Sequence, residues 1–114
     1  MSKQRAIYGL RKESEFNEIV KKHTYVIVKA EADWCGPCQR MKPLFAKLVN
    51  ELPTSVAIII INIDQSPELK RKFRISSVPL LFNVINGEVQ DMINSSNPKD
   101  VESLFLKTKN RITN

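Results

Sequence analysis

Hydrophobic and polar residues recur along this chain in two periods, one typical of strands and the other of helices. Residues 6–10 are expected to form a short edge strand. Residues 14–23 carry apolar side chains at helical spacing, with Ser14 as the expected N-cap. Residues 25–32 predict a strand with two distinct faces. One face holds Val26, Val28, Ala30 and Ala32, and the other holds Tyr25, Ile27, Lys29 and Glu31.

The middle of the chain predicts a long helix, a buried strand and a short helix. An apolar stripe at helical spacing covers residues 35–52, and Pro43 inside it should kink that helix because proline lacks an amide donor. Residues 56–61 are apolar at every position, which is typical of a buried parallel strand. Ser66-Pro67 is expected to begin a short helix, with Ser66 as its N-cap.

The last third predicts a hairpin and a final helix. Residues 80–85 and 88–93 read as strands joined through Asn86-Gly87, a dipeptide typical of tight hairpin turns. Asn97-Pro98 should begin the last helix, and the tail from Lys109 is expected to fray. Strands that alternate with helices before a hairpin indicate an α/β fold, a central mixed sheet of about five strands with helices on both faces.

Length and composition indicate one globular domain over residues 1–114. With 42% hydrophobic residues, such a chain can bury a core without a structural disulfide. No apolar stretch reaches the ~20 residues that cross a membrane, and the basic start lacks the apolar core of a secretory signal. If the sequence is complete, we expect a cytoplasmic, reducing location, where a cysteine pair is catalytic or metal-binding rather than structural.

The net charge of +6 comes with two basic clusters, residues 70–74 and 107–111. Such clusters can bind nucleic acid or an acidic partner, or they can be solvated surface. No nucleic-acid motif accompanies them, so we interpret them as solvated surface and do not expect nucleic-acid binding.

The sequence holds two cysteines, Cys35 and Cys38, separated by two residues at the start of a predicted helix. Side chains three residues apart on a helix are neighbours, so the sulfurs can form a disulfide. Cys35 at the helix N-terminus is favoured as a thiolate and should be the more exposed sulfur. We therefore expect Cys35 to attack a substrate disulfide and Cys38 to resolve the mixed disulfide.

These residues are also compatible with other roles. Cys-x-x-Cys is also half of a zinc site, but the chain has only His23 as a further nitrogen ligand of that kind, so we expect no metal. His23 is expected only to end a helix. Trp34 could belong to the core, but beside a reactive cysteine it is expected to line a partner groove.

The motif Trp34-Cys35-Gly36-Pro37-Cys38, preceded by Ala32-Asp33, resembles the active-site segment of the thioredoxin family. Pro43, Asn62-Ile63-Asp64, Val78-Pro79 and Asn86-Gly87-Glu88 lie at matching spacings, so the resemblance covers essentially the whole chain.

This resemblance implies the thioredoxin fold, with Cys35 as nucleophile, Cys38 as resolving thiol and Pro79 as a cis-proline. It also implies that Trp34, Gly36, Pro37, Val78 and Pro79 bind substrate, with Val78 presenting its backbone to an extended chain. The implied partners are protein disulfides and an electron donor similar to thioredoxin reductase. No cofactor beyond the Cys35–Cys38 disulfide is expected, and the protein is expected to be a monomer.

The chain departs from the family around the thiols. Lys29 stands where the family carries a buried Asp, and Glu31 replaces an aromatic residue. Ile60 replaces a buried Lys, Leu80 a threonine and Ser95 a glycine. Lys29 and Glu31 share one strand face and could pair, which would lower the cost of burying the ammonium.

Two interpretations of Lys29 follow. In one, Lys29 takes over the role of the missing Asp near Cys38, as a charge that favours the thiolate or as a base that accepts its proton. The protein would then be a stronger oxidant than a carboxylate-bearing relative. In the other, Lys29 extends to water and that role is lost.

Two functions from different classes remain. The first is a protein-disulfide reductase of the thioredoxin type, which reduces or exchanges disulfides. The second is a thioredoxin-fold binding module whose redox activity is weak or incidental; the substitutions around the thiols favour it, and the intact motif argues against it. A disulfide isomerase fits less well, because neither a secretory signal nor a second domain is visible.

Overall fold

The computed structural model describes residues 4–113. The elements follow the order β1 (Ile7–Leu10), α1 (Glu13–Lys22), β2 (Tyr25–Glu31), α2 (Gly36–Arg40), α3 (Lys42–Asn50), β3 (Val56–Asn62), α4 (Pro67–Lys72), β4 (Leu80–Ile85), β5 (Glu88–Ile93) and α5 (Pro98–Thr113). The strands form one five-stranded sheet in the order β1-β3-β2-β4-β5. The first three strands in this order are parallel, and β4 and β5 are antiparallel to their neighbours.

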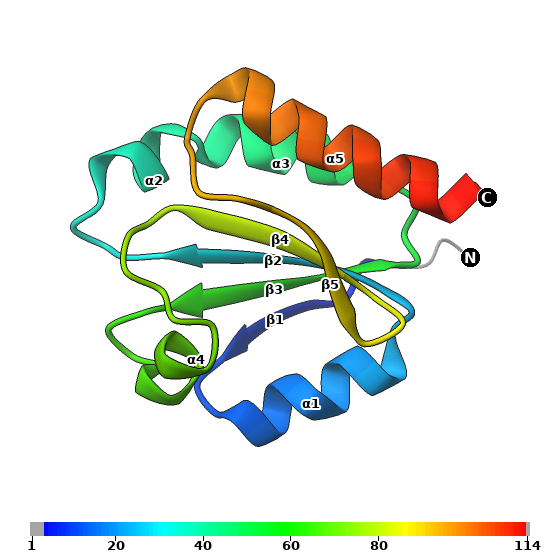
Figure 1. The fold of residues 1–114 in the computed structure, drawn as a ribbon. Coiled ribbons are helices and arrows are strands. Elements are labelled where there is room, and N and C mark those ends of the chain that lie inside the picture. Colours follow the sequence, from blue (N-terminus) through cyan, green and yellow to red (C-terminus); the bar gives the residue numbers. More distant parts are fainter. Residues whose placement is uncertain (1–3, 114) are drawn as a thin grey trace.

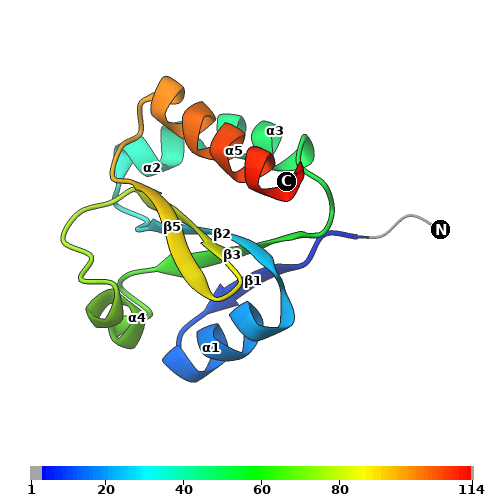
Figure 2. The same cartoon turned by 45° about the vertical axis from the view of Figure 1, so that its right-hand side comes forward.

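Helices cover both faces of the sheet, which confirms the predicted fold class. In Figures 1 and 2, α1 and α4 lie on one side, and α2, α3 and α5 lie on the other. The first face packs Phe16 and Leu69 against Val26 and Val28 of β2. On the second face, the apolar residues of α3 and α5 meet alternate residues of β2, β3 and β4: Ile27, Phe45, Val49, Ile58, Leu81, Val101, Leu104 and Phe105.

The helix predicted over residues 35–52 is two helices rather than one kinked helix. α2 ends at Arg40, and α3 begins at Lys42. Pro43 occupies the first turn of α3, where a missing amide donor costs nothing because that position has no helical acceptor. The chain therefore changes direction at Met41, and α2 carries the second cysteine independently of α3.

Two of the expected helix caps behave differently from the prediction. Ser14 is not the N-cap of α1: the N-cap lies two residues earlier, at Lys12, and the helix begins at Glu13. The Glu15 carboxylate, at the third position of the helix, accepts the amides of Arg11 and Lys12 at 3.1 and 3.0 Å and so fixes the chain as it enters the helix. Ser66 is the N-cap residue of α4 as predicted, but its hydroxyl donates to the Leu10 carbonyl at 2.6 Å instead of capping the helix.

The segment before β1 is fixed by Arg5, whose role no sequence pattern indicated. Its guanidinium donates to the carbonyls of Val49, Leu52, Pro53 and Val56 at 2.7–2.9 Å. The last carbonyls of a helix have no helical donor, and a guanidinium with five N–H groups can serve several of them at once. Arg5 thus joins the end of α3 to the beginning of β3.

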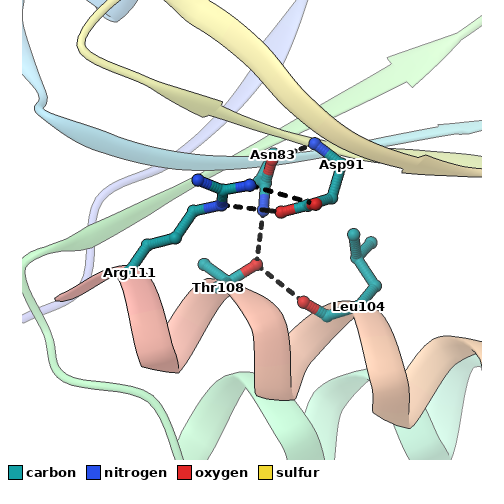
Figure 3. A network of polar contacts seen from close by, with 5 residues as sticks. All are labelled: Asn83, Asp91, Leu104, Thr108 and Arg111. Carbon is teal, nitrogen blue, oxygen red and sulfur yellow. Dashed lines mark hydrogen bonds and ion pairs between the residues drawn. The ribbon is translucent and has the colours of Figure 1, made fainter. Parts of the chain in front are cut away.

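The predicted fraying from Lys109 is wrong, because α5 continues to Thr113. Figure 3 shows the polar network that holds its end against the sheet. Buried Asn83 donates to Asp91 at 2.8 Å and to Thr108 at 2.9 Å, and it accepts the Asp91 amide at 2.8 Å. Arg111 donates to both Asp91 carboxylate oxygens at 2.8 and 3.2 Å. These contacts lower the pKa of Asp91, chiefly through Arg111.

Two turns use left-handed backbone. Asn86 and Gly87 have φ angles of 53° and 82°, so the predicted hairpin turn is confirmed. Arg74, just after α4, has a φ of 50°, a conformation that usually requires glycine. The Ile75 amide then donates back to the Lys70 carbonyl at 3.0 Å, which ends the helix and directs the chain toward Val78-Pro79. Within residues 4–113, no helix is long and apolar enough to cross a membrane.

Candidate active site

The disulfide between Cys35 and Cys38 lies where β2 gives way to α2. Cys35 is the N-cap of α2, and its Sγ accepts the Cys38 amide at 3.1 Å. The first amides of a helix have no helical acceptor and attract negative charge. The N-terminus of α2 is therefore arranged to stabilise a Cys35 thiolate when the disulfide opens.

The two cysteines differ little in exposure. Cys35 is 4% exposed and Cys38 is 0% exposed, so their order agrees with the prediction, although both are buried. The outer face of Cys35 meets the segment before β4: its Sγ lies 3.7 Å from the Val78 carbonyl oxygen. A disulfide sulfur has no hydrogen to donate there, whereas the Cys35 thiol of the reduced form would have one.

The peptide bond between Val78 and Pro79 is cis, as the resemblance implied. Pro79 is buried and Val78 is half-buried, so Val78 is the part of this segment that reaches the surface beside Cys35. Gly36 is exposed and Pro37 is half-buried between the two cysteines. The structure thus places the Val78 carbonyl against Cys35, the residue between Trp34 and Gly36 in the sequence.

Trp34 lies at the surface, with 69% of its area exposed. Its indole Nε1 donates to Asp64 Oδ2 at 2.9 Å, and Asn62 donates to Asp33 at 3.3 Å. The Asp64 amide in turn donates to the Asn62 side chain at 3.0 Å. The loop after β3 therefore holds the indole in place while leaving most of its surface free.

Lys29 and Glu31 form the predicted ion pair. The Lys29 Nζ lies 3.0 Å from Glu31 Oε1 and 4.3 Å from the centre of the Phe45 ring. Lys29 is only 4% exposed, so the alternative that it extends to water is wrong. Glu31 Oε1 accepts no hydrogen bond, so its contact with the Lys29 ammonium is an ion pair without hydrogen-bond geometry. This leaves the carboxylate dependent on Lys29 for compensation of its charge.

Arg40 also lies at the site, although sequence reasoning did not single it out. A side chain built on Gly36 would meet its guanidinium at 3.0 Å. Arg40 also lines a pocket of about 240 Å³ beside Pro37, together with Met41, Leu44, Ser96 and Pro98. This places a cationic group against Gly36, the residue that follows Cys35.

His23, the one histidine of the sequence, lies away from the disulfide. His23 ends α1 as predicted, and its Nε2 is 2.9 Å from the Tyr8 hydroxyl. His23 also lines a larger hollow of about 530 Å³ with Asn86 and Gly87, at the turn between β4 and β5 and not at the disulfide. Among the described residues, no three His, Cys, Asp or Glu side chains are grouped so as to hold a metal ion.

Comparison with known proteins agrees with this geometry. The family model described as Thioredoxin matches residues 8–108. The thioredoxin of Rickettsia bellii is 34% identical over 74 residues, which is 65% of this chain and 70% of that protein. A probable thioredoxin-2 of Caenorhabditis elegans is 36% identical over 84 residues, covering 73% of this chain and 58% of that protein.

Solved structures give the same result. Plasmodium falciparum thioredoxin superposes with a TM-score of 0.81 at 28% identity, covering 88% of this chain and 97% of that one. Oxidised mitochondrial thioredoxin 3 of Saccharomyces cerevisiae gives a TM-score of 0.82 at 26% identity, covering 89% of this chain and 94% of that one.

Proposed function

Since this chain belongs to the thioredoxin family and is a thiol–disulfide oxidoreductase, we propose that it reduces or exchanges disulfides of protein substrates through Cys35 and Cys38. The observation that carries this proposal is the position of Cys35. It caps α2, accepts the Cys38 amide and lies beside Val78. One sulfur is thereby stabilised as an anion at the surface segment where a substrate chain would bind.

The reaction begins from the dithiol. The Cys35 thiolate attacks one sulfur of the substrate disulfide, so a mixed disulfide forms and the first substrate thiolate leaves. Cys38, deprotonated, then attacks Cys35 Sγ, and the second substrate thiolate leaves. Two electrons have passed to the substrate, and the enzyme holds the Cys35–Cys38 disulfide seen in this structure. A dithiol donor, which we propose is a reductase of the thioredoxin-reductase type, restores the thiols.

We assign the substrate groove to Trp34, Gly36, Pro37, Val78 and Pro79. Exposed Trp34 offers an apolar surface, and Val78 offers backbone to an extended substrate segment. The groove lies in a protein of net charge +6, so neutral or acidic partners should be preferred and salt should weaken their binding.

The pair of Lys29 and Glu31 is proposed to tune the thiols. A buried ammonium favours thiolates over the neutral disulfide and so raises the reduction potential, but Glu31 at 3.0 Å offsets part of that field. Lys29→Ala and Lys29→Asp should therefore lower the potential and shift the pH–rate profile. No change in either variant would remove Lys29 from the redox chemistry.

Several further features stay proposals. We propose that the protein acts as a monomeric domain, with its disulfide as the sole redox group and no cofactor. The cytoplasmic location expected from the sequence also stays a prediction, since similar proteins include the mitochondrial thioredoxin of Mus musculus, 31% identical over 91 residues.

Insulin reduction with dithiothreitol as electron donor tests the proposal. Cys35→Ser should abolish turnover. Cys38→Ser should accumulate a mixed disulfide on Cys35, which captures the substrates for identification. If the wild-type protein reduces no insulin, and the Cys35→Ser variant binds partners as well as the wild type does, the protein is instead a binding module.

A further inference from the structure

Asn94, in the linker between β5 and α5, holds the segment that faces the disulfide. Its Nδ2 donates to the carbonyls of Ser77 and Pro79 at 3.2 and 2.8 Å. Its Oδ1 accepts the Ser77 hydroxyl at 2.7 Å. A primary amide has two N–H donors, and here both bind backbone carbonyls of one short segment.

The pattern of these bonds decides which backbone group reaches the disulfide. The carbonyls on either side of Val78 are engaged by Asn94, whereas the Val78 carbonyl oxygen lies 3.7 Å from Cys35 Sγ. Rotation of the segment would bring a different carbonyl to Cys35 and would break both bonds to Asn94. The amide thus favours the one orientation in which Val78 presents its backbone beside the sulfur.

We propose that Asn94 is a positioning residue for protein substrates, which acts by fixing the orientation of residues 77–79. This inference rests on the proposed binding of an extended substrate chain along Val78. Asn94 touches neither sulfur, so its effect should be confined to substrates that use the Val78 backbone. A small disulfide needs only the Cys35 thiolate and should not depend on it.

The isosteric variant Asn94→Asp gives the sharpest perturbation. It keeps the size and the acceptor for Ser77 but replaces both donors with a carboxylate oxygen that repels two carbonyls. Asn94→Ala removes the contacts without repulsion, and because the site is exposed, water can replace them in part. The loss of function should therefore be larger for Asn94→Asp than for Asn94→Ala.

Asn97→Asp is the matched control. Asn97 lies on the same linker, and its Oδ1 accepts the Lys99 amide at 2.9 Å. An aspartate retains that bond while adding the same charge near the site. Any electrostatic effect common to both variants can then be subtracted.

The assay compares insulin with the small disulfide dithiobis(nitrobenzoate), using dithiol-form protein well below its unfolding temperature. We expect Asn94→Asp to lower kcat/KM for insulin about tenfold, mainly through KM, and Asn94→Ala by about threefold. Rates with the small disulfide should stay within about twofold of the wild type, as should both rates of Asn97→Asp.

Three results would overturn the inference. Unchanged insulin kinetics in Asn94→Asp would show that the amide only supports the fold. An equal loss for both disulfides would place its effect on the thiol and not on substrate positioning. A wild-type protein that reduces neither disulfide would overturn the proposed function and this inference with it. The wild type is therefore assayed before any variant is compared.

Discussion

Lys29→Met tests how the fold compensates charge buried on β2. Methionine keeps an unbranched apolar stem but removes the ammonium. The Lys29 and Glu31 side chains are 5% and 14% exposed, and Glu31 Oε1 has no hydrogen-bond donor besides that ionic contact. The variant therefore removes the cation paired with a largely buried carboxylate, and it removes the contact of the ammonium with the Phe45 ring.

The magnitude follows from the burial of the two partners. Removing one member of a buried ion pair costs about 3–5 kcal/mol in unfolding free energy. Glu31 retains some contact with water, so we expect Lys29→Met to lower the unfolding free energy by about 3 kcal/mol, the lower end of this range. For a domain of this size, that lowers Tm by about 12 °C. Glu31→Gln should cost at least as much, because Lys29 is the more deeply buried partner.

The double variant Lys29→Met/Glu31→Gln distinguishes a charge effect from a packing effect. It contains no uncompensated charge, so its stability should return to within about 1 kcal/mol of the wild type. Thermal and urea unfolding of the four oxidised proteins, followed by circular dichroism, measures this cycle. Additive losses, with the double variant less stable than either single variant, would refute the reasoning.

Three further predictions concern stability away from the disulfide. The pKa of Asp91 is lowered mainly by Arg111, so its stabilisation is present above the ordinary pKa of about 3.9 and is lost as pH falls through the lower folded value. Arg111→Met should make Tm fall less between pH 5 and about 2, and an unchanged acid dependence would contradict this assignment. Arg74→Gly should raise the unfolding free energy by about 0.5–1 kcal/mol, because glycine adopts the positive φ of this position without strain. Arg74→Ala should give no gain, and urea unfolding of both variants measures the difference. Asn83→Ala should cost about 2–3 kcal/mol, because it leaves Thr108 and the Asp91 amide short of partners; a loss below about 0.5 kcal/mol in the same assay would argue that water replaces the amide.

Some features could be predicted because short-range pattern and local backbone chemistry decide them. Alternation along residues 25–31 placed Lys29 and Glu31 on one face, and the ion pair followed from that geometry. The Asn86-Gly87 turn needed only residues that accept positive φ. The Cys35–Cys38 spacing likewise implied a pair that could close at a helix start.

Other features could not be predicted because they join residues far apart in the chain. Arg5 completes the end of α3 across 44–51 positions, and Asn94 reaches back 15–17 positions to the segment beside Cys35. Neither residue carries a local pattern that distinguishes it from an ordinary surface side chain. The fraying predicted from Lys109 failed for the same reason, because Arg111 finds its partner on β5.

Local patterns along the chain account for the order of the elements, the faces of the strands and the two thiols one helical turn apart. These depend on periodicity and on intrinsic backbone preferences, which act over a few residues. The surroundings of the Cys35 sulfur depend instead on long-range packing, which brings up the Val78 carbonyl and the Asn94 amide that orients it. Hydrogen bonds between distant segments form only when packing has already brought them within about 3 Å, and no local pattern records that distance.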